Sequence, residues 1–133
     1  MVRQREIGVF PEGEVRLTIK VNRDEVVAEE SDLGRTWRFL RRDHPPGVGV
    51  GIAQFASLPE GVDPADRYEA HDVPEVHYVL SGRGILFEEG EEVALRVGDA
   101  VVTPPGIRHT LWSTGNEPLV TLYVAIQGTL FDG

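Results

Sequence analysis

A short segment near the middle of the chain gathers four side chains that can bind a metal ion or move a proton. In EAHDVPEVHYVLSGRG, residues 69–84, two glutamates and two histidines fall within nine positions: Glu69, His71, Glu75 and His77. Side chains of a strand alternate between its two faces, so Glu75 and His77 share one face. A buried carboxylate is costly unless it is paired or bound to a cation. If this face points inward, the cluster calls for a divalent metal ion as compensating charge.

A second segment supplies another candidate ligand. In GDAVVTPPGIRHTLW, residues 98–112, Pro105 and Gly106 suit the central positions of a type II turn. The turn reverses the chain just before a further predicted strand. On that strand His109 and Leu111 share a face. The sequence therefore predicts that His109 enters the same interior as the first cluster.

Composition narrows the class of protein. The chain has 133 residues, no cysteine and a net charge of -9. This length fits one domain, and the absence of cysteine excludes disulfides and thiolate ligands. An acidic chain without a basic face argues against nucleic-acid partners. No signal peptide or apolar run of membrane-spanning length is visible, so we expect no membrane partner and a cytoplasmic protein.

Glycine and proline punctuate short apolar stretches, which favours an all-β domain. One short helical turn is expected over Asp63–Arg67, with Asp63 as cap and Pro64 at the first helical position. The predicted strands are Val15–Lys20, Glu25–Ala28, Thr36–Arg41, Val48–Phe55, Arg67–His71, Glu75–Leu80, Gly84–Glu88, Glu92–Val97, Ala100–Thr103, His109–Ser113 and Leu119–Gln127.

This many short strands predicts an antiparallel double-sheet barrel, which leaves few free sheet edges and has room for one small ligand. We expect a single domain over residues 1–133, with a polar N-terminal arm or outer strands over residues 1–35. The barrel core is expected over residues 48–127.

The two segments together resemble the paired motifs of the cupin superfamily, G-x5-H-x-H-x3/4-E-x6-G and G-x5-P-x-G-x2-H-x3-N. Gly98, Pro104, Gly106 and His109 match the second motif, although Ser113 stands where the final asparagine is expected. In the first motif the spacing is kept by the residues His71, Glu75 and Gly82. The first histidine is replaced by Glu69, and the leading glycine is missing. The resemblance covers residues 48–127 and implies the jelly-roll-like, double-stranded β-helix barrel of small microbial cupins.

The resemblance places metal ligands on His71, Glu75 and His109, with Glu69 in the position of the other histidine. Two histidines and one carboxylate are the ligand count of non-haem Fe(II) oxygenases, while added oxygen ligands also suit Mn or Ni, and Zn fits as well. Glu69 is either a fourth ligand, a proton-transfer group or a pocket wall in a cupin that has lost its metal. His77 is a ligand, a partner of a ligand or an acid/base group.

Two functions of different classes follow. The first is a metal-dependent enzyme acting on a small organic molecule, with dioxygenase or related oxidoreductase chemistry as its main form. In that case Glu69 or His77 moves a proton. Isomerases, epimerases and lyases of the same superfamily are the runner-up enzymes. The second function is a non-catalytic cupin that binds or senses a small ligand. By analogy with small cupins that pair through an N-terminal strand, we expect a homodimer.

Overall fold

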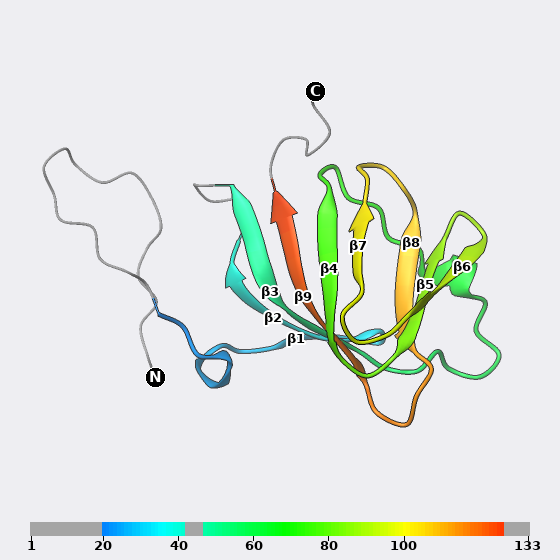
Figure 1. The fold of residues 1–133 in the computed structure, drawn as a ribbon, viewed down its shortest axis with the longest axis horizontal. Coiled ribbons are helices and arrows are strands. Elements are labelled where there is room, and N and C mark those ends of the chain that lie inside the picture. Colours follow the sequence, from blue (N-terminus) through cyan, green and yellow to red (C-terminus); the bar gives the residue numbers. More distant parts are fainter. Residues whose placement is uncertain (1–19, 42–46, 127–133) are drawn as a thin grey trace, which may run out of the picture.

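The computed structural model describes residues 20–41 and 47–126, which form nine strands and two 3-10 helices (Figure 1). The helices are η1 (Arg23–Glu25) and η2 (Pro64–Arg67). The strands are β1 (Glu29–Ser31), β2 (Gly34–Leu40), β3 (Val48–Phe55), β4 (Glu75–Ser81), β5 (Gly84–Glu88), β6 (Glu91–Leu95), β7 (Ala100–Thr103), β8 (His109–Ser113) and β9 (Leu119–Ile126).

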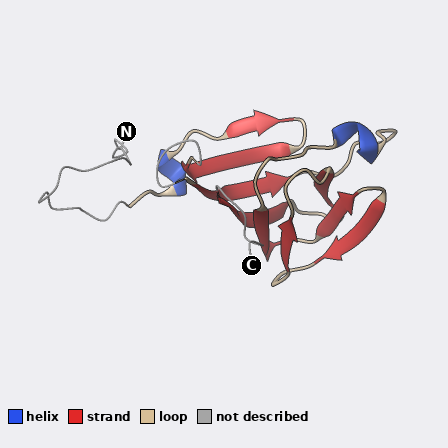
Figure 2. Cartoon of the chain, turned by 90° about the horizontal axis from the view of Figure 1, so that it is seen from above, coloured by secondary structure: helices blue, strands red, loops and turns tan. Residues whose placement is uncertain are grey.

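The strands form two antiparallel sheets (Figures 1 and 2). The larger sheet has the order β1-β2-β3-β9-β4-β7, and the smaller has the order β6-β5-β8. Isolated bridges from Ser57 to Ser113 and from Glu69 to His109 join β8 to the chain that follows β3. This double-sheet arrangement confirms the all-β, antiparallel barrel predicted from the sequence.

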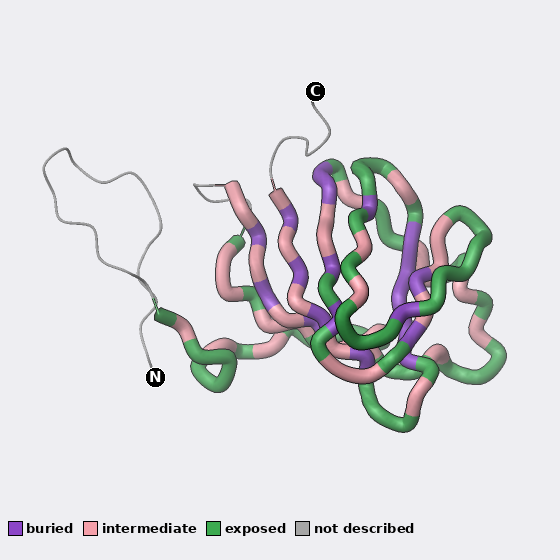
Figure 3. Tube along the Cα trace, viewed as in Figure 1, coloured by how far each residue is buried: buried purple, intermediate pink, exposed green. Residues whose placement is uncertain are grey.

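Alternate residues of the central strands face the interior, as a period of two requires. Burial alternates along the whole of β9 and along β3 as far as Gln54 (Figure 3). One end of the interior is filled by apolar side chains. This core cluster consists of Val79, Leu86, Leu95, Leu111 and Leu119. The inner residues of β4 change from Val79 in this core to His77 and Glu75 at the other end, so the polar side chains gather at the opposite end of the barrel.

Local sequence explains the connections that hold these strands in place. Asp63 caps η2 by accepting a hydrogen bond from the Ala65 amide at 2.9 Å, and Pro64 occupies the first helical position as predicted. Between β5 and β6, Glu89 and Gly90 both have positive φ, 47° and 84°, as a type I′ hairpin turn requires.

Two predicted strands are wrong. Residues 25–28 do not pair, because Asn22 and Glu25 form a capping box that starts η1, and the strand begins only at Glu29. Residues 67–71 also form no strand: Arg67 ends η2, and only Glu69 makes a bridge, to His109. The predicted strand over residues 15–20 lies outside the described residues except for Lys20, which belongs to no element.

The remaining predicted strands are observed with shifts of at most two residues at their ends. Part of the expected N-terminal arm, residues 1–19, lies outside the described residues, as does Gln127. The described part of the arm contributes β1 as the edge strand of the larger sheet. Among the described residues, no helix is long and apolar enough to cross a membrane.

Candidate metal centre

Glu75 and His77 lie on the inner face of β4, as the alternation predicted. Glu75 pairs in register with Ala125 on β9 and Thr103 on β7, and His77 pairs with Tyr123 and Val101. The Glu75 side chain is 14% exposed, and that of His77 is buried. β4 is flanked by two paired strands, so both side chains are fixed at defined positions of the barrel wall.

His71 reaches the same interior from the loop before β4. The turn over residues 104–107 holds it there: the Gly106 amide donates to the His71 carbonyl at 2.8 Å. Within the turn the Ile107 amide donates to the Pro104 carbonyl at 3.4 Å, and Gly106 has a φ of 79°. A positive φ at this position is what the predicted type II turn demands of glycine. The second motif thus positions a residue of the first.

His109 begins β8 directly after this turn and is buried. Its backbone exchanges two hydrogen bonds with Glu69, at 2.8 and 2.9 Å. Its ring Nδ1 lies 3.0 Å from the Ile107 carbonyl oxygen. A carbonyl only accepts, so Nδ1 carries a proton and donates, which leaves Nε2 as the ring nitrogen that can bind a metal. This is the arrangement in which a metal-binding histidine is usually oriented.

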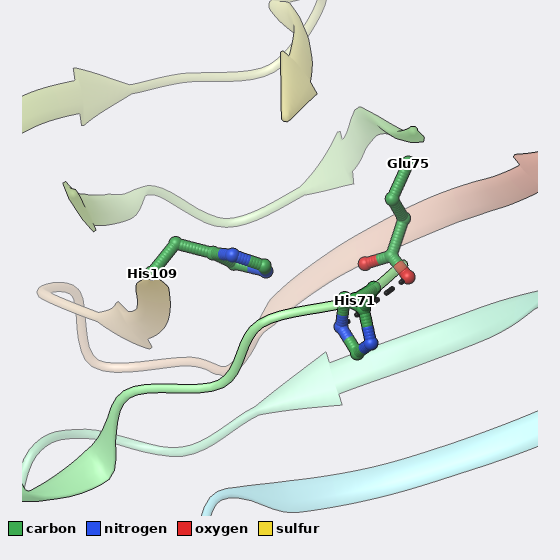
Figure 4. Close-up of side chains that lie close together, drawn as sticks. All are labelled: His71, Glu75 and His109. Atoms are coloured by element: carbon green, nitrogen blue, oxygen red, sulfur yellow. Dashed lines mark ion pairs between the residues drawn. The ribbon is translucent and has the colours of Figure 1, made fainter. Parts of the chain in front are cut away.

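The three side chains converge on one point (Figure 4). One ligand atom from each of His71, Glu75 and His109 lies within 4.8 Å of the other two. The rings of His71 and His109 have centroids 5.3 Å apart, and Nε2 of His71 is 3.6 Å from Oε2 of Glu75. All three line a cavity of about 500 Å³ that is open at one end of the barrel. A cavity of this size accommodates a small organic molecule.

The environment of Glu75 favours its charged form. Burial alone would raise the pKa of this carboxyl group. The hydrogen bond and charge of His77, followed by the charges of His71 and His109, outweigh burial, so the pKa of Glu75 is lowered. An ionised carboxylate between two imidazoles is a suitable donor set for a divalent cation.

His77 lies next to Glu75 on the inner face of β4 and also lines the cavity. Its Nε2 is 2.6 Å from Oε1 of Glu75, and its Nδ1 is 2.8 Å from Oγ1 of Thr121 on β9. The carboxylate accepts from Nε2, so each nitrogen of the ring has a partner. Thr121 is fully buried, and nothing in the sequence motifs pointed to it.

Glu69 also lines the cavity, but at its rim. Its side chain is 57% exposed, and its carboxylate lies 3.9 Å from Nε2 of His71. It does not belong to the group of three whose ligand atoms converge. The backbone bridge to His109 fixes its place in the fold, whereas its side chain retains access to solvent.

Two further residues that line the cavity are Arg38 of β2 and Tyr123 of β9. From the sequence, Arg38 could either meet an anionic substrate or be a surface charge, and Tyr123 was not singled out. The guanidinium donates to the Tyr123 hydroxyl at 3.2 Å. The alternating pattern of LVTLYVAI, residues 119–126, places Tyr123 on the same face as Thr121 and was a usable signal for it. For Arg38 the only signal in the sequence is its charge.

Comparison with known proteins identifies relatives of the whole barrel. The cupin domain family matches residues 55–125, just over half of the chain. An oxalate-binding protein from Thermotoga maritima is 28% identical over 101 residues, which are 76% of this chain and 71% of that protein. An uncharacterized protein from Methanocaldococcus jannaschii is 26% identical over 110 residues, covering 80% of this chain and 86% of the relative.

Solved structures share the fold at lower sequence identity. The hydroxypropylphosphonic acid epoxidase from S. wedmorenis superposes with a TM-score of 0.68 at 15% identity, over 82% of this chain but only 59% of the epoxidase chain. The cupin domain of Cnp3 from Schizosaccharomyces pombe gives a TM-score of 0.65 at 9% identity, over 84% and 76% of the two chains. Identities this low establish the common barrel and not a common reaction.

Proposed function

Because the chain belongs to the cupin family, whose fold hosts many activities, we propose its function from its own site: a mononuclear metal-binding cupin that acts on a small organic molecule. The observation that carries the proposal is the convergence of His71, Glu75 and His109 on one point of the cavity wall. Three protein ligands are fewer than a divalent transition metal usually takes, so a small molecule can complete the coordination.

The donor set supports a metal in three ways. Glu75 is held in its ionised form, and His109 is oriented by the Ile107 carbonyl so that Nε2 is free to bind. His77 and Thr121 support Glu75 from behind, as second-layer partners of metal ligands commonly do. Fe, Mn, Ni and Zn all accept such nitrogen and oxygen donors.

Dioxygenase or related oxidoreductase chemistry is the form of the proposal that two histidines and one carboxylate favour. A bound metal would supply Lewis-acid chemistry and, as iron, redox chemistry with molecular oxygen. In this proposal Glu69, at the solvent-accessible rim, moves a proton to or from the substrate. His77 also lines the cavity, but both of its ring nitrogens are engaged by Thr121 and Glu75, so we assign it to the positioning of Glu75 rather than to proton transfer with the substrate.

Oxygen uptake tests the catalytic form. Protein loaded anaerobically with Fe(II) is exposed to oxygen with each member of a panel of small organic molecules, and zinc-loaded protein serves as the redox-silent control. We expect substrate-dependent oxygen consumption by the iron form alone, and none by His109→Ala. Saturable binding of panel members without any consumption would reject the oxygenase and leave a binding protein.

A non-catalytic ligand-binding function is the second candidate. It is favoured by one observation: the relative from Thermotoga maritima that covers 76% of this chain is named an oxalate-binding protein. In that case the metal and the cavity hold a small ligand without turnover. A homodimer and residence in the cytoplasm stay predictions from the sequence. Size-exclusion chromatography with light scattering tests the first of them.

A further inference from the structure

A second polar group, separate from the candidate metal ligands, lines the cavity on the same face of the larger sheet, nearer to its β1 edge than β4 is. Arg38 of β2 donates from one terminal nitrogen to the Tyr123 hydroxyl and from Nε to Glu29 of β1. Arg41 lies 3.9 Å from the same Glu29 carboxylate. Arg38 and Arg41 thus both lie beside the half-exposed carboxylate of Glu29, and all three residues line the cavity. The hydrogen bond to Glu29 shows that the Arg38 guanidinium can bind a carboxylate here.

The backbone is adapted to bring Tyr123 to Arg38. The two residues are on strands separated by β3, and both pair in register with Gly51. A Cβ atom at Gly51 would lie 2.7 Å from Cε1 and from the hydroxyl of Tyr123. The tyrosine side chain therefore lies across the space that any other residue at position 51 would fill. A glycine here lets the hydroxyl reach over one strand to the guanidinium.

Both partners keep donors that no described residue uses. A guanidinium has five N–H groups, and the described contacts of Arg38 occupy Nε and one terminal nitrogen. The Tyr123 hydroxyl accepts from Arg38, so its own proton is available to a ligand. Burial, the largest effect, raises the pKa of Tyr123, so the group stays a donor at neutral pH. A fork of N–H groups beside a hydroxyl matches the two oxygens of a carboxylate.

We propose that Arg38 and Tyr123 form a carboxylate-binding subsite, so that the molecule held at the metal is a small organic acid with a carboxylate at its far end. The part of this inference in which the acid binds the metal rests on the proposed function. The subsite itself rests on the contacts of Arg38 and Tyr123. The Tyr123 hydroxyl lies over β3, two strand spacings or about 10 Å from β4. After about 2 Å for a metal–oxygen bond and about 3 Å for a hydrogen bond, about 5 Å remain between the two carboxylate oxygens, which a diacid of about three to five carbons spans. Oxalate is too short to do so.

Calorimetric titration of zinc-loaded protein with malonate, succinate and glutarate tests the subsite, with oxalate as the probe that reaches the metal alone. Arg38→Gln should weaken binding of the best of the three longer acids by about 10- to 100-fold and leave oxalate within about 2-fold. Tyr123→Phe, which keeps the ring over Gly51, should weaken the same acid by about 3- to 10-fold. Arg83→Gln, which removes an equal charge from an exposed residue outside the cavity lining, is the matched control.

The subsite is rejected if neither Arg38→Gln nor Tyr123→Phe weakens any longer acid more than Arg83→Gln does, or if the wild type binds none of them at millimolar concentration. Zinc content is measured on every sample. A wild type that holds no zinc contradicts the metal proposal instead. In that case NMR titration of the metal-free chain with glutarate decides the subsite: shifts that depend on Arg38 support it, and shifts independent of Arg38 or absent overturn it.

Discussion

At the scale of single residues, Glu75 connects the candidate metal centre to the barrel wall. One carboxylate oxygen faces His71, 3.6 Å away, and the other lies 2.6 Å from His77. His77 is fixed in turn by Thr121. The carboxylate therefore has one oxygen directed at the ligand cluster and one held by a buried hydrogen-bond chain. A hydrogen-bond chain of this kind keeps a metal-binding carboxylate ionised and in a fixed orientation.

The hydrogen bonds that link Glu75, His77 and Thr121 predict that His77 affects metal binding, although His77 is not assigned as a ligand. His77→Leu removes the hydrogen bond to Glu75 and should weaken metal affinity by about 10- to 100-fold, as measured by competition with a chelator. His77→Gln, whose amide can donate at a similar place, should retain most of the affinity. If both variants bind metal as the wild type does, Glu75 needs no support from His77.

Glu69 allows a test that separates a rim carboxylate from a fourth ligand. Its side chain stands 57% exposed beside His71 and outside the converging group. We expect Glu69→Gln to bind metal with unchanged stoichiometry and affinity, and to lose turnover once a substrate is known, because the amide cannot move a proton. Loss of metal from this variant would instead make Glu69 a ligand.

The sequence predicted the three converging residues because their spacing is tied to turns that any such barrel must make. The turn at Gly106 precedes His109 in the chain and, in space, also holds His71. For Arg38 the sequence left open whether the side chain meets an anionic ligand or is a surface charge. Its place in the cavity lining depends on the pairing of β2 with β3, which the pattern of one strand does not reveal.

At the scale of elements, β3 explains why the barrel is open at one end and filled at the other. Its inner positions are Gly49, Gly51, Ala53 and Phe55, which increase in size along the strand. Gly49 and Ala53 line the cavity with little or no side chain, whereas Phe55 both lines the cavity and packs against the apolar core. The graded size of side chains on one strand thus gives space to the ligand cluster on the neighbouring strands.

Gly51→Ala should lower stability because the added methyl group has no room. Its Cβ would lie 2.2 Å from the Trp37 carbonyl oxygen and 2.7 Å from the Tyr123 hydroxyl. Overpacking of this kind costs about 1–3 kcal/mol of the free energy of unfolding. Chemical denaturation provides the measurement. Gly115→Ala is the control, with its nearest neighbour at 3.5 Å and an expected change within about 0.5 kcal/mol. Equal stability of the two variants would show that β2 and β9 yield freely at Gly51.

Strands were predicted well where turns with glycine or proline delimit them. They were predicted poorly where a side-chain cap starts a 3-10 helix instead of a strand. The bounds Val48–Phe55, Gly84–Glu88, Ala100–Thr103 and His109–Ser113 are observed as predicted. Residues 25–28 look like a strand by composition, but the capping box of Asn22 and Glu25 satisfies the local backbone first. Residues 67–71 are extended for only part of their length, because η2 includes Arg67.

At the scale of the whole molecule, the candidate ligands come from three separate elements of the chain. His71 lies in a loop, Glu75 begins β4, and His109 begins β8 after a hairpin and a turn. A metal held by all three ties these segments together only in the folded state. Its binding free energy therefore adds to the stability of the fold.

Chelation should consequently lower the melting temperature. Metal present at about 1,000 times its dissociation constant adds about 4 kcal/mol, which corresponds to a shift on the order of 10 °C for a domain of this size. Differential scanning calorimetry of the wild type with and without a chelator measures this shift, and His109→Ala should show none. A wild-type curve that the chelator leaves in place would mean that no metal contributes to the fold.

The metal content of the untagged protein, purified without added metal and analysed by elemental mass spectrometry, tests the central claim most directly. The convergence of His71, Glu75 and His109 predicts close to one atom of Fe, Mn, Ni or Zn per chain, and its loss in His109→Ala. Wild-type protein that contains no metal, even after soaking in each of these ions, would contradict the claim. The cavity would then be that of a cupin that has lost its metal.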